Sequence, residues 1–211
     1  KYHTHLIPSG VFYNIPSIIG PDCYINEKDF KDEIEYLNSL GFNTDIIKIS
    51  PNAHVIKDEH IKEDQHNKKS NNSTGKGIAP CSGDKFKRKG IILKHCDSTF
   101  LKKYMWDECL YGNILCEGAQ GFWLDVNYGD YPYVTSSYTL PYSSCSLGFP
   151  TQKINNIYGA AKIYDTRVGS DPYFDNDTFD LDILRNIAVK GNEYGTTTGR
   201  PRNVKWLNLD K

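Results

Sequence analysis

The stretch Ile114-Leu115-Cys116-Glu117-Gly118-Ala119-Gln120-Gly121 does most to decide the fold class of this chain of 211 residues. A short apolar run ends abruptly in glycines and one planar amide, as a strand does where it opens onto a ligand. Open α/β sheets bind their ligands at the carboxyl ends of the strands. We therefore expect a strand over residues 113–116 and a binding surface over residues 117–121. A strand followed by a Gly-rich turn with no ligand is the alternative for this segment alone.

The segment that follows is rich in hydroxyl groups. Tyr131-Pro132-Tyr133-Val134-Thr135-Ser136-Ser137 offers hydroxyl and backbone N–H donors, which are the groups that hold a phosphate. Glu117 and Asp125 are candidate acid or base groups. Each could equally order its loop by accepting hydrogen bonds from backbone donors.

The rest of the chain alternates between helix-like and strand-like segments. Apolar side chains recur at helical spacing over residues 29–40, and Gly41 is typical of a helix end. Further elements are expected as a strand over 45–49, a mobile loop or frayed helix over 60–73, a helix over 100–111, a helix over 154–161 that continues into a strand over 162–164, and a helix over 181–189. Helices between strands predict an α/β fold with a mainly parallel central sheet flanked by helices. The chain length suggests a single α/β domain over residues 1–211.

Composition excludes several classes of partner. With 25 Lys and Arg residues against 26 Asp and Glu residues, the formal net charge is −1, so charge balance predicts no nucleic-acid or membrane binding. No apolar run is long enough to span a bilayer. The scattered cysteines form no C-x-x-C pair, which favours free thiols in a reducing cytoplasm. They are Cys23, Cys81, Cys96, Cys109, Cys116 and Cys145.

Two basic segments could contact anions. Ser73-Thr74-Gly75-Lys76-Gly77 combines glycines, hydroxyls and a lysine, although it lacks the Gly-x-x-x-x-Gly-Lys-Ser/Thr pattern of a Walker A loop. Asp84-Lys85-Phe86-Lys87-Arg88-Lys89-Gly90 is a basic cluster in which Arg88 could bind a phosphate through two hydrogen bonds. The alternatives are a surface turn for the first segment and a solvated face for the second.

A third donor-rich segment lies near the carboxyl end. Gly195-Thr196-Thr197-Thr198-Gly199-Arg200-Pro201-Arg202 carries hydroxyls and two arginines with no acidic residue, so its natural ligand is a carboxylate or a phosphate. A structural loop with exposed arginines is the alternative. The six histidines show no metal-binding spacing, and no Ser-His-Asp or Cys-His arrangement is present. We therefore assign no catalytic residue and no metal ligand within this chain.

Taken in order, these segments resemble adenylosuccinate synthetase, in a compact form like the archaeal and phage branches. The matching pieces are residues 5–10, residues 73–77 with Ile78 and Pro80, Asp84-Lys85 with Arg88 and Gly90, and residues 117–121, 131–137, 166–169 and 195–202. The resemblance implies an α/β fold related to the P-loop NTPases. It also implies an enzyme of purine biosynthesis, a C–N ligase that couples IMP and L-aspartate using GTP and Mg²⁺. GTP phosphorylates the 6-oxygen of the purine, and the aspartate amine then displaces that phosphate.

The resemblance also implies roles for individual residues. IMP would be bound by Thr74 and Thr135 at its phosphate, by Gln120 at its purine, and by Arg88 from the other subunit of a homodimer. Aspartate would be bound by Thr197, Thr198 and Arg200. Arg202 would help to organise this loop and would serve the GTP side.

The chain also departs from the family pattern. The opening Gly-Asp-Glu-Gly-Lys-Gly loop with its catalytic Asp and Mg²⁺ site, the Asn-Ala-Gly-His segment and the Lys-x-Asp guanine motif are absent from residues 1–211. We therefore expect an incomplete central portion that is inactive alone, with its Mg²⁺ ligands in a missing amino-terminal segment. Lys76 stands where Arg is usual and Asp171 where Gly is usual, and Tyr138 and residues 142–145 depart from a small, Gly-rich segment.

Two alternatives stay open. The phage relatives join aspartate to dGMP, although Leu124-Asp125 and Thr197-Thr198-Gly199 look closer to the ordinary synthetase. An inactive nucleotide-binding fragment is the other alternative. The sequence does not decide between GTP and ATP as the phosphate donor.

Overall fold

The computed structural model describes residues 2–71, 73–169, 171–172, 174, 180–195 and 199–208. Its helices are α1 (Glu27–Ser39), α2 (Asp58–Asn71), α3 (Ile78–Phe86), α4 (Thr99–Lys102) and α5 (Leu181–Lys190). Its strands are β1 (Ser17–Ile19), β2 (Tyr24–Ile25), β3 (Ile47–Ile49), β4 (His54–Val55), β5 (Tyr164–Arg167) and β6 (Asn203–Trp206). Short 3₁₀ turns cover Ser9–Tyr13, Leu93–His95, Phe122–Leu124, Pro141–Leu147 and Thr151–Lys153.

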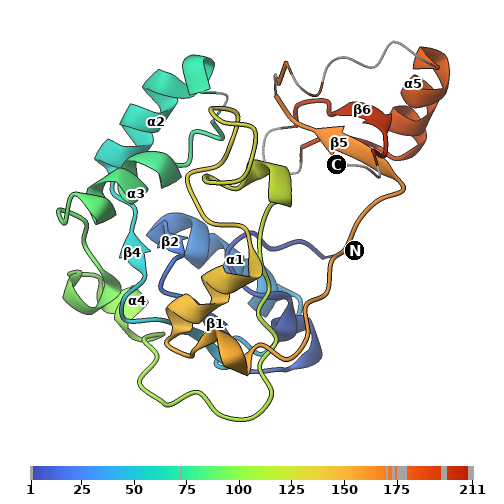
Figure 1. The fold of residues 1–211 in the computed structure, drawn as a ribbon. Helices are drawn as coiled ribbons and strands as arrows, with labels where there is room; N and C mark the ends of the chain where they lie inside the picture. Colours follow the sequence, from blue (N-terminus) through green and yellow to red (C-terminus); the bar gives the residue numbers. More distant parts are fainter. Residues whose placement is uncertain are drawn as a thin grey trace.

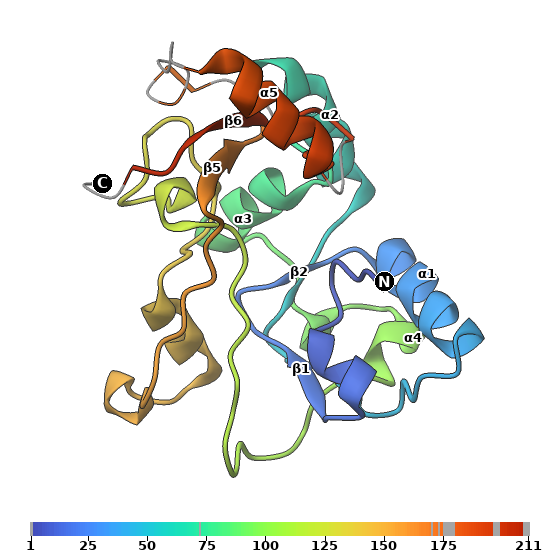
Figure 2. The same cartoon turned by 90° about the vertical axis from the view of Figure 1, so that its right-hand side faces the viewer.

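The strands form three pairs. β1 pairs with β3 in parallel, with Ile18 opposite Lys48, and β2 pairs with β4 in parallel, with Tyr24 opposite His54. β5 and β6 are antiparallel. β5, β6 and α5 lie together at one end of the molecule, away from α1 and α4 (Figures 1 and 2). The α/β class and the parallel pairing are confirmed, although within the described residues each sheet has two strands.

Helix α1 supplies one side of the hydrophobic core. Asn26 caps its first turn by accepting a hydrogen bond from the backbone N–H of Asp29 at 2.9 Å. Phe30, Ile34 and Leu37 follow at helical spacing and are buried in the same core cluster as the isoleucines of β1 and β3. The predicted helix over residues 29–40 and the strand over 45–49 are therefore confirmed, with small shifts in their ends.

Most of the polar segment over residues 60–73 lies in α2, so the helix alternative is the one the structure favours. Its contact with the rest of the protein is polar. His60 and Asp64 lie on α2 with exposed fractions of 4% and 3%, and both hydrogen-bond to the loop and helix that follow. The apolar periodicity is weak because partnered polar side chains occupy part of the buried face.

Three predicted elements are wrong, because tertiary contacts outweigh local pattern. The helix expected over residues 100–111 ends at Lys102. The chain that follows pairs with Ile49 instead: the carbonyl of Ile49 accepts the N–H of Trp106 at 2.8 Å, and the N–H of Ile49 donates to the carbonyl of Tyr104 at 2.7 Å. Residues 113–116 form no strand, because a strand needs a neighbour and none pairs with them within the described part of the chain. Residues 154–161 are irregular and lead into β5.

The carboxyl-terminal helix expected over residues 181–189 is confirmed as α5. The six cysteines are free thiols, as predicted. Across the described ranges, no helix combines the length and the apolar character that a membrane span requires.

Gly77→Ala should destabilise the fold more than Gly41→Ala. Both glycines have φ +81°, so both alanines carry left-handed backbone strain. A Cβ at position 77 would also meet Ile56 Cγ2 and the backbone nitrogen of Ile61 at 3.0 Å, whereas nothing lies within 4 Å at position 41. In urea unfolding we expect a loss of about 3 kcal/mol for Gly77→Ala and about 1 kcal/mol for Gly41→Ala. Equal losses would contradict the close approach of α2 to Gly77.

Candidate functional site

Helix α3 organises two of the predicted ligand-binding loops. The loop over residues 73–77 leads directly into the amino end of α3. On the second turn of α3, the Ser82 hydroxyl donates to the carbonyl oxygen of Ser136 at 3.4 Å, in the loop over residues 131–137. The two loops, about sixty residues apart in sequence, therefore meet at one helix. The sequence pattern did not predict that they lie together.

The loop over residues 73–77 is held in shape by α2. Asp64, which is 3% exposed, accepts a hydrogen bond from the N–H of Gly77 at 2.8 Å. The Ser73 hydroxyl accepts from the N–H of Gly75 at 3.1 Å, and both glycines have positive φ. A loop whose donors are fixed in this way is preorganised before any ligand arrives.

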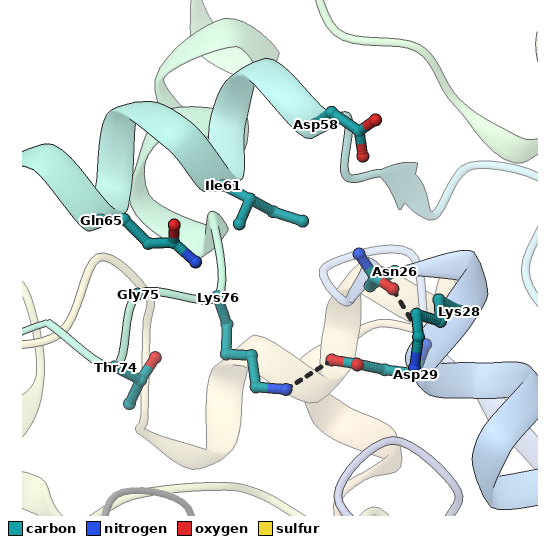
Figure 3. Close-up of a pocket in the computed structure, with 9 residues that line it drawn as sticks. All are labelled: Asn26, Lys28, Asp29, Asp58, Ile61, Gln65, Thr74, Gly75 and Lys76. Atoms are coloured by element: carbon teal, nitrogen blue, oxygen red, sulfur yellow. Dashed lines mark hydrogen bonds and ion pairs between the residues drawn. The ribbon is translucent and has the colours of Figure 1, made fainter.

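A pocket of about 330 Å³ lies between this loop, α2 and the start of α1 (Figure 3). Its lining residues are Asn26, Lys28, Asp29, Asp58, Ile61, Gln65, Thr74, Gly75 and Lys76. Thr74 is exposed, so its hydroxyl is accessible at the pocket. The ammonium of Lys76 crosses the pocket to Asp29 Oδ2 at 2.8 Å, which ties α1 to the loop.

His60 joins α2 to α3 through both of its ring nitrogens. Nδ1 accepts a hydrogen bond from the N–H of Lys57 at 3.1 Å, so Nε2 carries the proton and donates to Asp84 Oδ2 at 3.2 Å. This hydrogen bond from His60 is the main reason that the pKa of Asp84 lies below its ordinary value. The backbone carbonyl of Asp84 also closes the carboxyl end of α3, because it accepts hydrogen bonds from the N–H groups of Lys89 and Gly90.

Arg88 lies just beyond the carboxyl end of α3, with φ +61° and an exposed side chain. Thr74 precedes the opposite end of the same helix. Nine helical residues span about 13 Å, which separates the two sites along the helix axis. The structure therefore does not bring Arg88 together with Thr74 within one chain, and its exposure leaves it accessible to a second molecule.

Thr135 lies in a loop that a buried carboxylate organises. Asp125 is 0% exposed, and its Oδ1 accepts from the N–H groups of Asn127 at 2.9 Å and Tyr128 at 3.2 Å. Its Oδ2 accepts from the N–H of Thr139 at 2.7 Å. Thr135 donates its N–H to the carbonyl of Leu124 at 2.8 Å. The loop-ordering alternative for Asp125 is thus the one the structure favours.

The environment of Asp125 shifts its acidity. Burial by itself raises the pKa of this carboxyl, but the backbone N–H donors, that of Thr139 foremost, outweigh burial and leave the pKa below its ordinary value. A carboxylate held ionised by fixed donors is a poor proton shuttle. Its role is structural.

A second anchor holds the loop over residues 131–137 from the side of β5. Arg167, at the end of β5, donates from Nη2 to the carbonyl oxygen of Tyr133. Its Nη1 pairs with Asp171 Oδ2 at 2.9 Å, and the two side chains are only 10% and 1% exposed. Asp171 stands where the resembled family usually has Gly, so the departure supplies the partner of a buried guanidinium.

Gln120 is exposed and has φ +61°, in the segment that precedes the turn at Phe122–Leu124. The nearby Glu117 accepts hydrogen bonds from the N–H of Ser9 at 3.1 Å and from its hydroxyl at 2.7 Å. Glu117 therefore tethers this extended segment to the amino-terminal part of the chain. Its loop-ordering alternative is again the one the structure favours.

The segment over residues 195–202 connects α5 to β6. Gly195 donates its N–H to the carbonyl of Arg200 at 2.8 Å, and Gly199 donates to Gly195 at 2.7 Å. Thr197 and Thr198 lie outside the described residues. Arg202 directs Nη1 toward Glu193 Oε2 at 3.4 Å, so its side chain takes part in the fold.

Sequence reasoning assigned no role to Asp64, to Glu193 or to Arg167 of the matching piece over residues 166–169, although all three hold the loops in place. No local signal distinguishes them, because each acts on a segment far away in sequence or across a turn.

The structure shows no metal centre among the described residues, because no group of three or more His, Cys, Asp or Glu side chains there could hold an ion. The placement of Mg²⁺ ligands stays a prediction.

An α/β core that carries donor-rich loops is the arrangement of a protein that binds an anionic ligand such as a nucleotide. The family model described as "Adenylosuccinate synthetase" matches residues 1–107 and 96–210. The chain therefore belongs to the adenylosuccinate synthetase family.

Individual relatives agree with this assignment. The chain is 35% identical to an adenylosuccinate synthetase of Lysinibacillus sphaericus and 36% identical to that of Brevibacillus brevis, with 98% of this chain aligned to 61% of each relative. It thus spans about three fifths of the length of these curated relatives.

Solved structures share the fold. A fully ligated adenylosuccinate synthetase from Plasmodium falciparum superposes with a TM-score of 0.82 at 29% identity, over 98% of this chain and 60% of that one. A succinoaminodeoxyadenylate synthetase of cyanophage S-2L, bound to dGMP and dATP, gives a TM-score of 0.72 at 19% identity, over 97% of this chain and 64% of that one. At that identity the phage protein shows the fold alone.

Asp125→Asn should destabilise the fold at neutral pH, because the amide cannot accept hydrogen bonds at both positions. We expect the unfolding free energy at pH 7 to fall by about 2–3 kcal/mol. Since the folded pKa lies below the unfolded value, the ionised carboxylate stabilises the fold above the unfolded pKa and loses this effect as pH falls through the folded pKa. The difference between wild type and variant in urea unfolding should therefore stay constant from pH 7 to about pH 4, near the ordinary pKa of Asp, and shrink from there toward about pH 2.

The matched control is Asp107→Asn, at an exposed position in the segment after α4. This variant should change the unfolding free energy by less than about 0.5 kcal/mol at either pH. A difference for Asp125→Asn that is constant across this pH range would contradict the assigned role of its charge.

Proposed function

We propose that the protein carrying this chain is a GTP-dependent adenylosuccinate synthetase, which ligates L-aspartate to IMP through a 6-phosphoryl-IMP intermediate. The observation that supports it most is the family match along nearly the whole chain, together with curated relatives of that name at 35% and 36% identity. Three loops of one α/β framework fit the anionic groups of the substrates. The loops over residues 73–77 and 131–137 offer donors for a phosphate, and the segment over residues 195–202 offers donors for a carboxylate. Such a biosynthetic enzyme would act in the cytoplasm.

In this proposal the loops around α3 hold the nucleotide. Thr74 and Thr135 bind the 5′-phosphate, since each offers a hydroxyl in a loop whose backbone is fixed by a buried carboxylate, Asp64 or Asp125. Ser82 links the two loops through Ser136. Gln120 contacts the purine through its amide. No group within this binding surface needs to act as a nucleophile, because positioning and charge stabilisation carry phosphoryl transfer.

Arg88 acts in a homodimer in this proposal. It is exposed beyond the end of α3, and in one chain it lies a helix length from the Thr74 loop. A contact from a neighbouring subunit would bring a guanidinium, able to form two hydrogen bonds, to a phosphate. The full enzyme would also bind Mg²⁺ and GTP, with Arg202 near the GTP side.

The reaction tests the substrate directly. The full-length protein that carries this chain should form adenylosuccinate from IMP, L-aspartate and Mg-GTP, detected by chromatography and mass spectrometry. Parallel reactions replace IMP with dGMP and GTP with ATP. Product from dGMP but none from IMP would favour the phage-type activity, and no product from either would favour an inactive nucleotide-binding protein.

Arg200→Leu should weaken aspartate binding far more than IMP binding. Arg200 lies in the segment over residues 195–202, and its guanidinium is proposed to pair with a substrate carboxylate. Losing such a contact costs a few kcal/mol, so the KM for aspartate should rise about a hundredfold. The KM for IMP should change by less than about threefold.

Arg185→Leu is the matched control, because Arg185 pairs only at the surface of α5 with the exposed Asp182 at 3.2 Å. It should leave both KM values near wild type. Equal changes in the KM for aspartate and for IMP in Arg200→Leu would count against the assignment.

A further inference from the structure

Lys76 and Asp29 form an ion pair across the pocket that Thr74 also lines (Figure 3). Lys76 Nζ donates to Asp29 Oδ2 at 2.8 Å. The two side chains are 47% and 37% exposed, so water reaches both charges. A pair of this kind contributes little free energy, because hydration and side-chain entropy offset most of the attraction. A more strongly charged anion can therefore replace Asp29 as the partner of the ammonium.

Asp29 is the fixed member of the pair. It lies in the first turn of α1, and its backbone N–H donates to the side chain of the capping residue Asn26 at 2.9 Å. A carboxylate in the first turn is stabilised by the positive end of the helix dipole, whether or not a lysine is near. Loss of the ion pair would therefore leave Asp29 and the start of α1 in place.

Lys76 is the member that can move. Its ammonium ends a flexible stem of four carbons, and the residue follows Thr74 by two positions in the same loop. This loop does not need the ion pair to keep its shape, because Asp64 and the Ser73 hydroxyl accept hydrogen bonds from its backbone N–H groups. The ammonium can therefore leave Asp29 while Thr74 stays where it is.

The second lysine of the pocket lining is engaged along its own helix. Lys28 Nζ donates to Asp32 Oδ2 at 2.6 Å, one turn further along α1. Lys76 is thus the cation that shares a loop with Thr74. A phosphate monoester carries about two negative charges and three acceptor oxygens at neutral pH, whereas a carboxylate carries one charge and two oxygens. A phosphate at Thr74 would attract the ammonium more strongly than Asp29 does.

We propose that Asp29 sets the affinity for IMP by competing with its 5′-phosphate for the ammonium of Lys76. The inference rests on the proposed function, in which Thr74 binds that phosphate. When the ammonium moves to the phosphate, the free energy of the pair with Asp29 is lost. The pair therefore weakens IMP binding by the amount that it contributes to the unligated protein.

The test measures the dissociation constant for IMP by titration calorimetry, on the full-length protein without GTP or aspartate. Asp29→Asn keeps the size of the side chain and removes the competing charge, so IMP should bind about threefold more tightly. Lys76→Met removes the ammonium and should weaken IMP binding about tenfold. Asp29→Asn added to Lys76→Met should then change nothing, because no ammonium remains to compete for. Inosine, which lacks the phosphate, should respond to neither variant.

Glu35→Gln is the matched control. Glu35 pairs with Lys31 at 3.9 Å on the exposed surface of α1, and neither residue belongs to the pocket lining. The variant removes one carboxylate and one exposed ion pair from the same helix. It should leave the dissociation constant for IMP unchanged.

The outcomes separate the two proposals. Wild type that binds no IMP overturns the proposed function and this assignment with it. Wild type that binds IMP, combined with an Asp29→Asn variant of equal or weaker affinity, overturns the role of Asp29 alone. An equal gain from Asp29→Asn with and without Lys76 also overturns the exchange, because the carboxylate would then act by long-range repulsion. A purely structural role would lower the melting temperature and weaken IMP binding, which is the opposite sign.

Discussion

The irregular parts of this protein depend on one interaction: backbone N–H groups donate hydrogen bonds to side-chain carboxylates. Asp64 accepts from Gly77, and Asp125 accepts from Asn127, Tyr128 and Thr139. Loops that do not join a sheet must find other acceptors for their donors, or bear the cost of burying them unpaired. An ionised carboxylate meets several donors at once. Each loop therefore gains a defined shape without regular secondary structure.

The amino-terminal segment follows the same rule. Glu33 on α1 accepts from the N–H groups of Leu6 and Ile7 at 3.1 Å each. Glu117 accepts a hydrogen bond from the N–H of Ser9. Glu193 contacts Arg202 twice, because its carboxylate accepts from the guanidinium and its backbone carbonyl accepts from the N–H. Acidic residues that look like candidate acids or bases in sequence thus act as anchors here.

Much of the first half of the chain could be predicted because its signals are local. Helix α1 combines an Asn cap, apolar residues at helical spacing and a glycine end, and all three act within a few residues of one another. Predictions for residues 100–161 were wrong more often. The segment around Tyr104 leaves the helical pattern to pair with Ile49, a partner 55 residues away that no local pattern reveals. Residues 113–116 have strand-like composition and no described neighbour to pair with.

The sequence by itself determined the family and the order of its candidate ligand-binding motifs, because short motifs such as Glu117–Gly121 and Gly195–Arg202 are specific as strings of residues. Only the tertiary structure decided how those motifs are held. It placed the Thr74 loop and the Thr135 loop at one helix through Ser82, and it set Arg88 at the far end of that helix. It also gave Asp64, Arg167 and Glu193 their roles. These depend on distances between atoms far apart along the chain, which packing sets and linear pattern does not record.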